Sequence, residues 1–397
     1  MPFCPHFGVC GGCAHQDLDY PAQLAQKAAW MQAWFAPNWN APVHVMPSPD
    51  LWHYRNKVDP AFQPMQYPEP PPKDFDRETV LGFKKKGKWF YPLDIETCLI
   101  GPQWLPQTFA AVRDWYREEG SRAWDARSGK GQLRYLLLRE GKQTGESMAV
   151  LITHSGGVNT ASFVDALNGV QAFTSVFHGL YDGKADVARA DRLELLQGNS
   201  AITETLRIGE GAGARTLAFR ISPFSFFQTN TLATEKLYSA IRNWVALAPT
   251  PFLYDLYGGA GGIAFSCADL AEEIVSVEEV AEATEDGRYN AGVNGIANVK
   301  FVTAKTERFL LNERDAGAFR SGATVILDPP RSALHPKVIK RLLELLPPRI
   351  GYISCNPKLL ARELAAFSEA YTIESLQAFD LFPHTPHVEA FATLVRR

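Results

Sequence analysis

The chain has 397 residues, of which 46% are hydrophobic and 21% are charged, and its formal net charge at pH 7 is −3. These values are typical of a globular protein with two or three domains, and they exclude a disordered, collagen-like or coiled-coil chain. The sequence has no run of about 18 apolar residues and no signal-peptide pattern, so we expect a cytoplasmic protein without a membrane span. The balanced charge gives no overall indication of nucleic-acid binding, although residues 84–88 contain four lysines.

The first sixteen residues are rich in cysteine, glycine and histidine and have no apolar periodicity. Cys4, Cys10 and Cys13 lie close together there, and Cys98 follows far downstream. In a cytosolic chain such clustering favours a metal site over disulfides, and four thiolates suit either tetrahedral zinc or an iron–sulfur cluster. The spacing of the cysteines leaves that choice open.

The part of the chain up to residue 220 is predicted to be rich in strands. The helical spacing of Leu24, Ala28, Met31 and Phe35 predicts one helix over residues 20–35. The other elements predicted in this part are strands broken by turns over 41–100 with a proline-rich loop at 68–72, a strand pair at 133–139 and 147–153, a helix at 160–172, and short strands over 174–220.

From residue 221 onward, predicted strands and helices alternate. The predicted strands are 252–256, 273–277, 299–302, 323–327 and 350–354, and the predicted helices include 231–246, 336–346 and 358–370. Apolar strands that alternate with helices are typical of a parallel sheet covered on both faces. We therefore expect two domains, a β-rich domain over 1–220 and a doubly wound α/β domain over 221–397.

Three features at the carboxyl ends of these strands predict a pocket for a nucleotide cofactor. Residues 255–262 contain four glycines between a strand and a helix, where the backbone can approach a ligand. Glu278 ends the next strand about 20 residues later, where a carboxylate accepts hydrogen bonds from ribose hydroxyls. Asp328 opens an Asp-Pro-Pro-Arg turn at the same edge, a turn that is common in methyltransferases acting on a nitrogen or a base. The glycine turn alone is compatible with NAD, with S-adenosylmethionine, or with no ligand.

Two residues near the end of the chain are candidates for catalysis. Cys355 follows a strand and precedes a helix, and we expect the helix N-terminus to lower the pKa of its thiol. The alternative for a cysteine at a strand end is a buried structural role. Glu389 begins the last strand, and the order of the strands can bring it near Cys355. His384 and His387 suggest zinc, but no third ligand is spaced to join them.

Together these residues resemble the uridine carbon-5 RNA methyltransferases, which use S-adenosylmethionine. The segments that carry the resemblance are 224–230, 255–262, 328–331, 354–357 and 383–389 and, in the N-terminal half, the four cysteines with 54–57 and 131–139. The resemblance implies a Rossmann-like methyltransferase domain and an N-terminal β-rich α+β domain with an iron–sulfur cluster. Two positions depart from the family pattern: Gly258 stands where Cys or Ser is usual, and Ala333 stands where Gly is usual.

The resemblance also implies a covalent mechanism. Cys355 adds to carbon 6 of uracil and so makes carbon 5 nucleophilic, and Glu389 removes the carbon-5 proton after methyl transfer. Asp328 with Arg331 is expected to orient the uracil, whose base must be flipped out of folded RNA. The expected contacts to S-adenosylmethionine are Gln228, Tyr257, Glu278 and Asp328.

The resembling subfamily carries a [4Fe–4S] cluster on this cysteine pattern, which implies Cys4, Cys10, Cys13 and Cys98 as ligands. The spacing differs from that of radical S-adenosylmethionine enzymes, so we expect a structural or RNA-orienting cluster. Members with the cluster but without an N-terminal TRAM barrel are similar to bacterial 23S rRNA methyltransferases. We therefore expect 23S rRNA as the substrate, with tRNA, or a non-catalytic RNA-binding role, as alternatives, and no obligate protein partner. The expected phosphate contacts are Arg55, Lys57, Lys84, Lys85, Lys86, Arg134 and Arg139, of which the last two are alternatively ordinary surface charges.

Overall fold

The computed structural model describes residues 3–69, 71–72 and 75–397. Its contacts divide the chain into two compact units. Unit 1 contains the described residues up to Asp17, those of Leu51–Glu204, and Ser222–Phe224, and unit 2 contains Leu18–Asp50, Thr205–Ile221 and Ser225–Arg397. The division therefore differs from the expected single boundary after residue 220, because two earlier segments pack with the C-terminal part.

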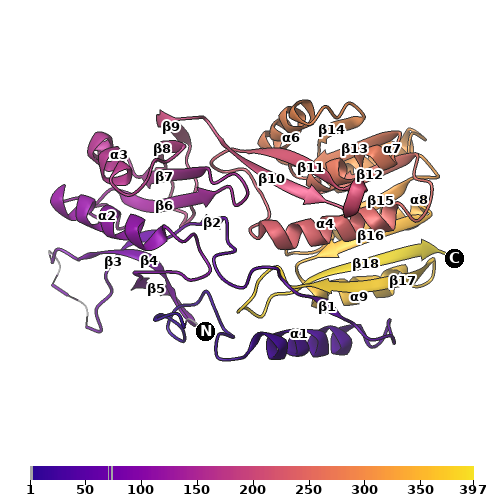
Figure 1. Ribbon diagram of the computed structural model, residues 1–397, viewed down its shortest axis with the longest axis horizontal. Helices are drawn as coiled ribbons and strands as arrows, with labels where there is room; N and C mark the ends of the chain where they lie inside the picture. The colour runs from indigo at the N-terminus through magenta and orange to yellow at the C-terminus, as the bar shows by residue number, and fades with distance from the viewer. Residues whose placement is uncertain (1–2, 70, 73–74) are drawn as a thin grey trace. The chain divides into compact units, whose positions relative to one another are not determined.

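Unit 2 is built on a mixed sheet, eight-stranded in the described part of the chain. Its strands are β1 (Val45–Met46), β12 (Phe252–Leu256), β13 (Glu273–Glu278), β14 (Val299–Thr303), β15 (Thr324–Leu327), β16 (Arg349–Ser354), β17 (Tyr371–Phe379) and β18 (Glu389–Arg396). They lie in the order β1-β17-β18-β16-β15-β12-β13-β14 (Figure 1). From β16 to β14 neighbouring strands run parallel, whereas β18 is antiparallel to both β16 and β17.

Helices cover both faces of this sheet, as the sequence predicts. Leu253 and Tyr254 are consecutive residues of β12, and they belong to different hydrophobic cores because side chains alternate along a strand. The core that contains Tyr254 also contains side chains of α1 (Tyr20–Phe35), α7 (Thr306–Asp315), α8 (Pro336–Leu345) and α9 (Pro357–Phe367). The core that contains Leu253 is shared with α4 (Thr231–Val245), α5 (Gly262–Ser266), α6 (Ala281–Val293) and the hairpin of β10 (Ile202–Ile208) and β11 (Arg215–Ile221).

Unit 1 has a second sheet of β-strands and two helices among its described residues. Its strands are β2 (Lys57–Val58), β3 (Ala61–Pro64), β4 (Thr79–Lys85), β5 (Lys88–Asp94), β6 (Leu133–Glu140), β7 (Ser147–Thr153), β8 (Ser175–Leu180) and β9 (Arg192–Gly198). The order is β5-β4-β3-β6-β7-β8-β9, with β2 paired to β6 (Figure 1). Helices α2 (Leu105–Glu118) and α3 (Thr160–Asn168) share the core of β6 and β7, so the expected β-rich α+β arrangement is present.

The strands that were predicted with definite bounds, from 133–139 to 350–354, agree with the structure to within a residue or two. Helices α2 and α7 are absent from the predicted elements, and α3 ends earlier than the predicted helix. None of the helices in the described part of the chain combines the length and apolar character that crossing a bilayer requires.

Candidate active site

Cys355 and Glu389 come together at one end of two adjoining strands of unit 2. Strand β16 ends at Ser354, β18 begins at Glu389, and their antiparallel register places Ser354 opposite Ala390. Cys355, the residue that follows β16, is therefore the cross-strand neighbour of Glu389, the first residue of β18. Their charges interact, since the Glu389 carboxylate raises the pKa of the Cys355 thiol.

The pKa of Cys355 is raised to about 11, first by burial and then by the negative charges of Glu389 and Asp328, while Arg331 opposes the shift. The net shift is therefore upward, opposite to the lowering that we expected from the N-terminus of α9. Desolvation and two nearby carboxylates outweigh the guanidinium of Arg331. Cys355 is partly exposed, and its thiol carries a proton at neutral pH.

The carboxyl groups of Glu389, Asp328 and Asp255 lie in this region, and burial raises the pKa of each. The Glu389 side chain is 3% exposed, and burial together with the charge of Asp328 raises its pKa well above the usual value. Burial raises the pKa of Asp328 to about 7, and burial with the charge of Asp328 raises that of Asp255 to about 7. Such perturbed carboxyl groups cluster at functional sites because they hold or accept protons near neutral pH.

The glycine turn after β12 adopts a conformation that most side chains resist. Tyr257 has φ 67° and Gly261 has φ 89°, both in the left-handed region. A Cβ on Gly258 would lie 2.0 Å from the Ser276 hydroxyl, and that hydroxyl donates a hydrogen bond to Asp255 at 3.2 Å. Glycine stands at residue 258, where the family usually has Cys or Ser, for a steric reason. Ser276 of the neighbouring strand fills the space that a side chain would need.

The four expected cofactor contacts all lie in unit 2. The Glu278 carboxylate accepts hydrogen bonds from the backbone N–H of Gly259 at 3.1 Å and of Val280 at 2.8 Å, so it holds the glycine turn from the end of β13. Gln228 forms a side-chain hydrogen bond with Tyr238 of α4, and Tyr257 forms one with Thr306 of α7. A bent glycine backbone beside carboxylates at the carboxyl edge of a parallel sheet fits the ribose and amino groups of a nucleoside cofactor.

Two residues of this site, Asp255 and Tyr238, were not predicted from the sequence to be functional. Asp255 is fully buried inside β12, and Tyr238 is buried on α4 near Asp328, Asp255 and Glu389. A charged residue within an otherwise apolar strand is a signal for Asp255. Tyr238 has no such signal, because an aromatic residue on a helix is usually an ordinary core residue.

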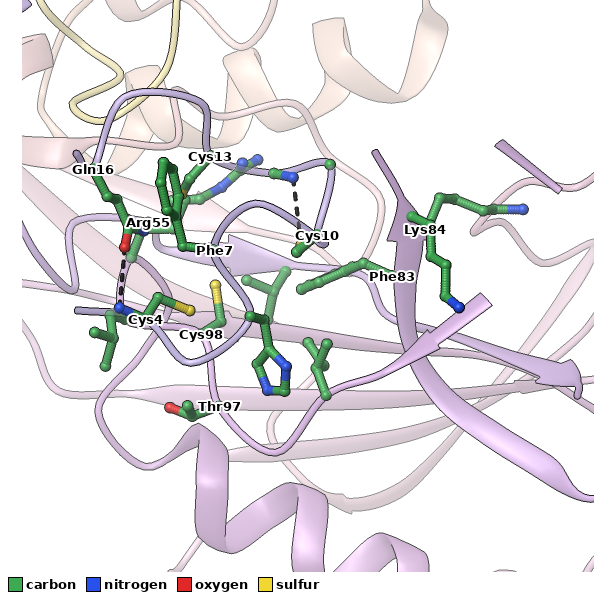
Figure 2. Close-up of a pocket in the computed structure, with 18 of the residues that line it drawn as sticks. Cys4, Phe7, Cys10, Cys13, Gln16, Arg55, Phe83, Lys84, Thr97 and Cys98 are labelled. Atoms are coloured by element: carbon green, nitrogen blue, oxygen red, sulfur yellow. Dashed lines mark hydrogen bonds between the residues drawn. The ribbon is translucent and has the colours of Figure 1, made fainter. Parts of the chain in front are cut away.

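The four clustered cysteines line one cavity of about 550 Å³ in unit 1 (Figure 2). Their segment is attached to β4, where Gly11 N–H donates to the Lys84 carbonyl at 3.1 Å and Lys86 N–H donates to the Val9 carbonyl at 2.8 Å. Burial and the charges of the other three thiolates raise the pKa of Cys13 to about 12. Cysteine sulfurs are donors of the kind that bind zinc or an iron–sulfur cluster, so the four side chains fit such a group by residue type. Among the described residues, however, no three His, Cys, Asp or Glu side chains are grouped closely enough to hold an ion as they stand.

Two of the expected phosphate contacts are wrong. Arg134 and Arg139 are only 4% and 3% exposed, so they are neither RNA contacts nor surface charges. The Arg134 guanidinium lies over the rings of Trp124 and Tyr181, 4.3 and 4.6 Å from their centroids, and donates to the Tyr181 carbonyl at 3.0 Å. The positive charge of Arg134 is therefore compensated by partners inside unit 1.

The remaining basic candidates differ in their surroundings. Burial lowers the pKa of Lys57, and Arg55 lines the cysteine cavity. Lys84 forms an ion pair with Asp186 at 2.6 Å. Lys86 is exposed and Lys85 is partly exposed, so these two are the candidates most open to a phosphate.

Comparison with known proteins identifies the family. Residues 184–397, more than half of the chain, match the tRNA (uracil-5-)-methyltransferase family. The chain is 32% identical to an RNA methyltransferase of Clostridium tetani, over 99% of this chain and 84% of that protein. It is also 32% identical to the tRNA (uracil(54)-C(5))-methyltransferase of Pyrococcus furiosus, over 99% of this chain and 85% of that protein.

A solved structure agrees with these sequence matches. The tRNA (uracil-54, C5)-methyltransferase of Pyrococcus abyssi, in complex with S-adenosyl-L-homocysteine, is similar with a TM-score of 0.77 at 29% identity, over 98% of this chain and 86% of that chain. The α/β Rossmann-like methyltransferase fold expected for the C-terminal part is thereby confirmed. The chain is a methyltransferase that belongs to the tRNA (uracil-5-)-methyltransferase family.

Proposed function

We propose that the protein transfers a methyl group from S-adenosylmethionine to carbon 5 of a uridine in RNA through a covalent enzyme–RNA adduct. The observation that carries the proposal is the cross-strand pairing of Cys355 with Glu389, beside the raised-pKa carboxyl group of Asp328. Family membership supports the same chemistry.

Cys355 is the nucleophile in this proposal. Its sulfur forms a bond to carbon 6 of the uracil, and the electrons of the 5,6 double bond move onto the C4–C5–O4 enolate. A pKa of about 11 keeps the thiol proton in place at neutral pH, so this proton passes to water at the partly exposed Cys355 before the thiolate adds to carbon 6. Arg331 lies near enough to lower that pKa, and so favours the thiolate.

Glu389 is the base that completes the reaction. S-adenosylmethionine, when bound, supplies the methyl group to carbon 5. Glu389 then takes the remaining carbon-5 proton, the double bond re-forms, and the Cys355 sulfur leaves carbon 6. A buried carboxylate with a raised pKa accepts a proton more readily than an exposed one, which suits this role.

The cofactor is held by the turn after β12 and by the segments around it. Gln228, Tyr257, Glu278 and Asp328 are proposed to bind it, with Glu278 on the ribose hydroxyls. Asp328 and Arg331 are also proposed to orient the uracil, since both interact electrostatically with Cys355.

We infer tRNA as the first candidate substrate, in place of the 23S rRNA expected from the cysteine pattern. Two Pyrococcus relatives that are 32% identical over 99% of this chain are named tRNA (uracil(54)-C(5))-methyltransferases. The Clostridium tetani relative is named only for RNA, so 23S rRNA stays as the second candidate, supported by the cysteine pattern.

The test is methyl transfer from labelled S-adenosylmethionine to purified tRNA and to 23S rRNA fragments, followed by mapping of the modified nucleoside. We expect 5-methyluridine in tRNA with the unaltered protein and none with Cys355→Ala. The matched control is Cys267→Ala, which removes a buried thiol outside the site and should leave transfer intact. Label in 23S rRNA alone would exclude tRNA, and full activity of Cys355→Ala would exclude the covalent route.

We further propose that Cys4, Cys10, Cys13 and Cys98 hold a [4Fe–4S] cluster that orders the N-terminal segment of unit 1. The support is their shared cavity and the attachment of their segment to β4. The side chains would have to move closer together around the cluster. Protein purified without oxygen should contain iron and acid-labile sulfide in equal amounts, and zinc without sulfide would contradict the proposal.

A further inference from the structure

The segment that leads to Glu389 is an unusually buried loop. Strand β17 ends at Phe379, and residues 380–388 cross to the start of β18. Within this stretch Asp380, His384 and Thr385 are all buried, although each has a polar side chain. A loop that is removed from water must satisfy its polar groups with fixed partners, and those partners then determine its conformation.

Lys27 of α1 provides the central contact to this loop. Its Nζ lies 2.7 Å from the Asp380 carboxylate and donates to the Phe382 carbonyl at 3.1 Å. Lys27 is 2% exposed and Asp380 is 1% exposed, so the ion pair is shielded from water. The same Asp380 oxygen accepts the Phe382 N–H at 3.1 Å, which closes the turn around the ammonium group.

Gln23, one helical turn earlier on α1, holds the next part of the loop. Its Oε1 accepts the backbone N–H of His384 at 2.9 Å, and its Nε2 lies 3.2 Å from His384 Nδ1. His384 has φ 65°, a left-handed conformation that is uncommon outside glycine and persists only where the surroundings enforce it. The α1 helix thus maintains a strained position five residues before Glu389.

A third anchor connects the loop to the segment of Gln228. Asn230 is the N-cap of α4, and its Nδ2 donates to the Leu381 carbonyl and to the Ser48 hydroxyl, each at 3.0 Å. The Asp380 N–H donates to the Met46 carbonyl at 2.9 Å. The loop is therefore bound on successive residues by three separate parts of unit 2.

The residue types on the buried face of α1 indicate that these contacts fix the conformation of the loop and do not only fill the core. Its buried residues are Gln23, Lys27, Met31 and Phe35, of which only the last two belong to the hydrophobic core. A buried ion pair contributes little net stability compared with apolar side chains of the same size, because both charges lose their hydration. The polar half of the face is better explained by the geometry that it imposes on the loop.

We propose that Lys27, with Gln23, is a positioning residue for methyl transfer: α1 holds residues 380–388 so that Glu389 faces carbon 5 of the uracil bound to Cys355. This inference rests on the proposed function, since it assigns Glu389 the proton-transfer step. Cys355 follows β16 and lies outside the loop. Loss of the positioning residue should therefore slow release of the methylated adduct much more than its formation.

The test uses the full chain with an RNA substrate and follows the covalent adduct on denaturing gels. In Lys27→Met, turnover should fall by up to about 100-fold, as misplacement of a catalytic group by about 1 Å can do, while adduct forms at nearly the original rate and accumulates. The matched control is Lys337→Met, at an exposed lysine of α8, which should behave like the unaltered protein. Equal slowing of adduct formation and release in Lys27→Met would overturn the positioning role.

A double variant, Lys27→Met with Asp380→Leu, covers the case in which the single variant fails to fold. It removes both charges together, so no unpaired charge is buried and thermal unfolding should stay close to that of the unaltered protein. Adduct should still accumulate, because the Phe382 carbonyl has lost its ammonium donor. A stable double variant with full turnover and no accumulated adduct would overturn the inference.

Glu389→Gln separates this inference from the proposed function. If Glu389→Gln accumulates adduct but the stable double variant does not, only the positioning role fails. If neither the unaltered protein nor Glu389→Gln forms any adduct with RNA, the covalent mechanism fails and the inference fails with it.

Discussion

The edge of the unit 2 sheet and the cysteine cavity of unit 1 hold their functional side chains in different ways. At the sheet edge, Cys355 directly follows β16 and Glu389 begins the adjoining strand β18, so the register of the two strands makes them neighbours. In the cavity, the four cysteines come from loops, and among the described residues no three ligating groups are close enough to hold an ion. A hydrogen-bonded sheet places side chains before any ligand arrives, whereas loop-borne ligands are brought together by what they bind.

The largest expected effect concerns the sheet edge. Glu389→Gln keeps the size of the side chain but removes the proton acceptor, so turnover should fall by about 10²–10⁴-fold, the usual contribution of a general base. Because the pairing of the strands is unchanged, RNA should still become attached to Cys355. Turnover would be measured by label transfer and attachment by gel shift under denaturing conditions. Loss of attachment together with turnover would mean that Glu389 is needed for the nucleophile itself.

The second prediction tests whether the cysteine cavity depends on its ligand. Cys13→Ser should lower the iron content and the melting temperature of unit 1, because a loop-borne site needs all of its ligands to stay closed. Binding of S-adenosylhomocysteine, measured by calorimetry, should remain within about twofold, since the sheet edge forms without any metal. Cys267→Ser is the control for loss of a thiol elsewhere. Normal iron content in Cys13→Ser would remove this residue from the ligand set.

The third prediction concerns pH. The pKa of buried Asp255 is raised to about 7 in the folded protein, above its unfolded value of about 3.9, so the folded state binds the extra proton. Its contribution to stability is complete below pH 4 and is lost as the pH rises toward 7, by about 1 kcal/mol per pH unit.

The matching variant is Asp255→Asn, which is neutral at every pH. It should be more stable than the unaltered protein at pH 8 and should lose part of the dependence on pH between 5 and 7. Urea unfolding at several pH values measures both effects. An unchanged slope in the variant would mean that Asp255 is not the titrating group.

The smallest effect is expected at Ala333, where the family pattern has glycine. Ala333 has φ 65°, so Ala333→Gly should relieve backbone strain and raise the free energy of unfolding by about 0.5–1 kcal/mol. The control is Ala316→Gly at φ −82°, where glycine should be neutral or destabilising. Denaturant unfolding of both variants gives the comparison, and a loss of stability in Ala333→Gly would contradict the assigned strain.

Much of the fold was accessible from local pattern. The predicted helix over 20–35 and the predicted strand over 252–256 have the same bounds as α1 and β12. The apolar face predicted for α1 is nevertheless wrong in its first half, because Gln23 and Lys27 are buried where Leu24 and Ala28 were expected. The partner that permits a buried Lys27 is Asp380, which lies 353 residues away in the sequence.

Burial of basic residues in unit 1 was likewise not predictable from local sequence. Arg134 and Arg139 look like surface charges on a strand, yet both are buried. Arg134 is accommodated by carbonyls of a segment that lies about fifty residues later in the sequence. Composition and spacing contain no information about such distant acceptors.

By itself, the sequence determined the kinds of reactive groups and their order: a thiol after one strand, a carboxylate at the start of another, glycines between β12 and α5, and three clustered cysteines with a fourth far downstream. The tertiary structure decided which of these groups are neighbours and how readily they ionise. It reversed the expected shift in the pKa of Cys355, because burial and nearby carboxylates depend on residues that only the folded sheet brings together. Residue type and local propensity can be read from the sequence, whereas desolvation and the proximity of charges depend on how the folded molecule packs.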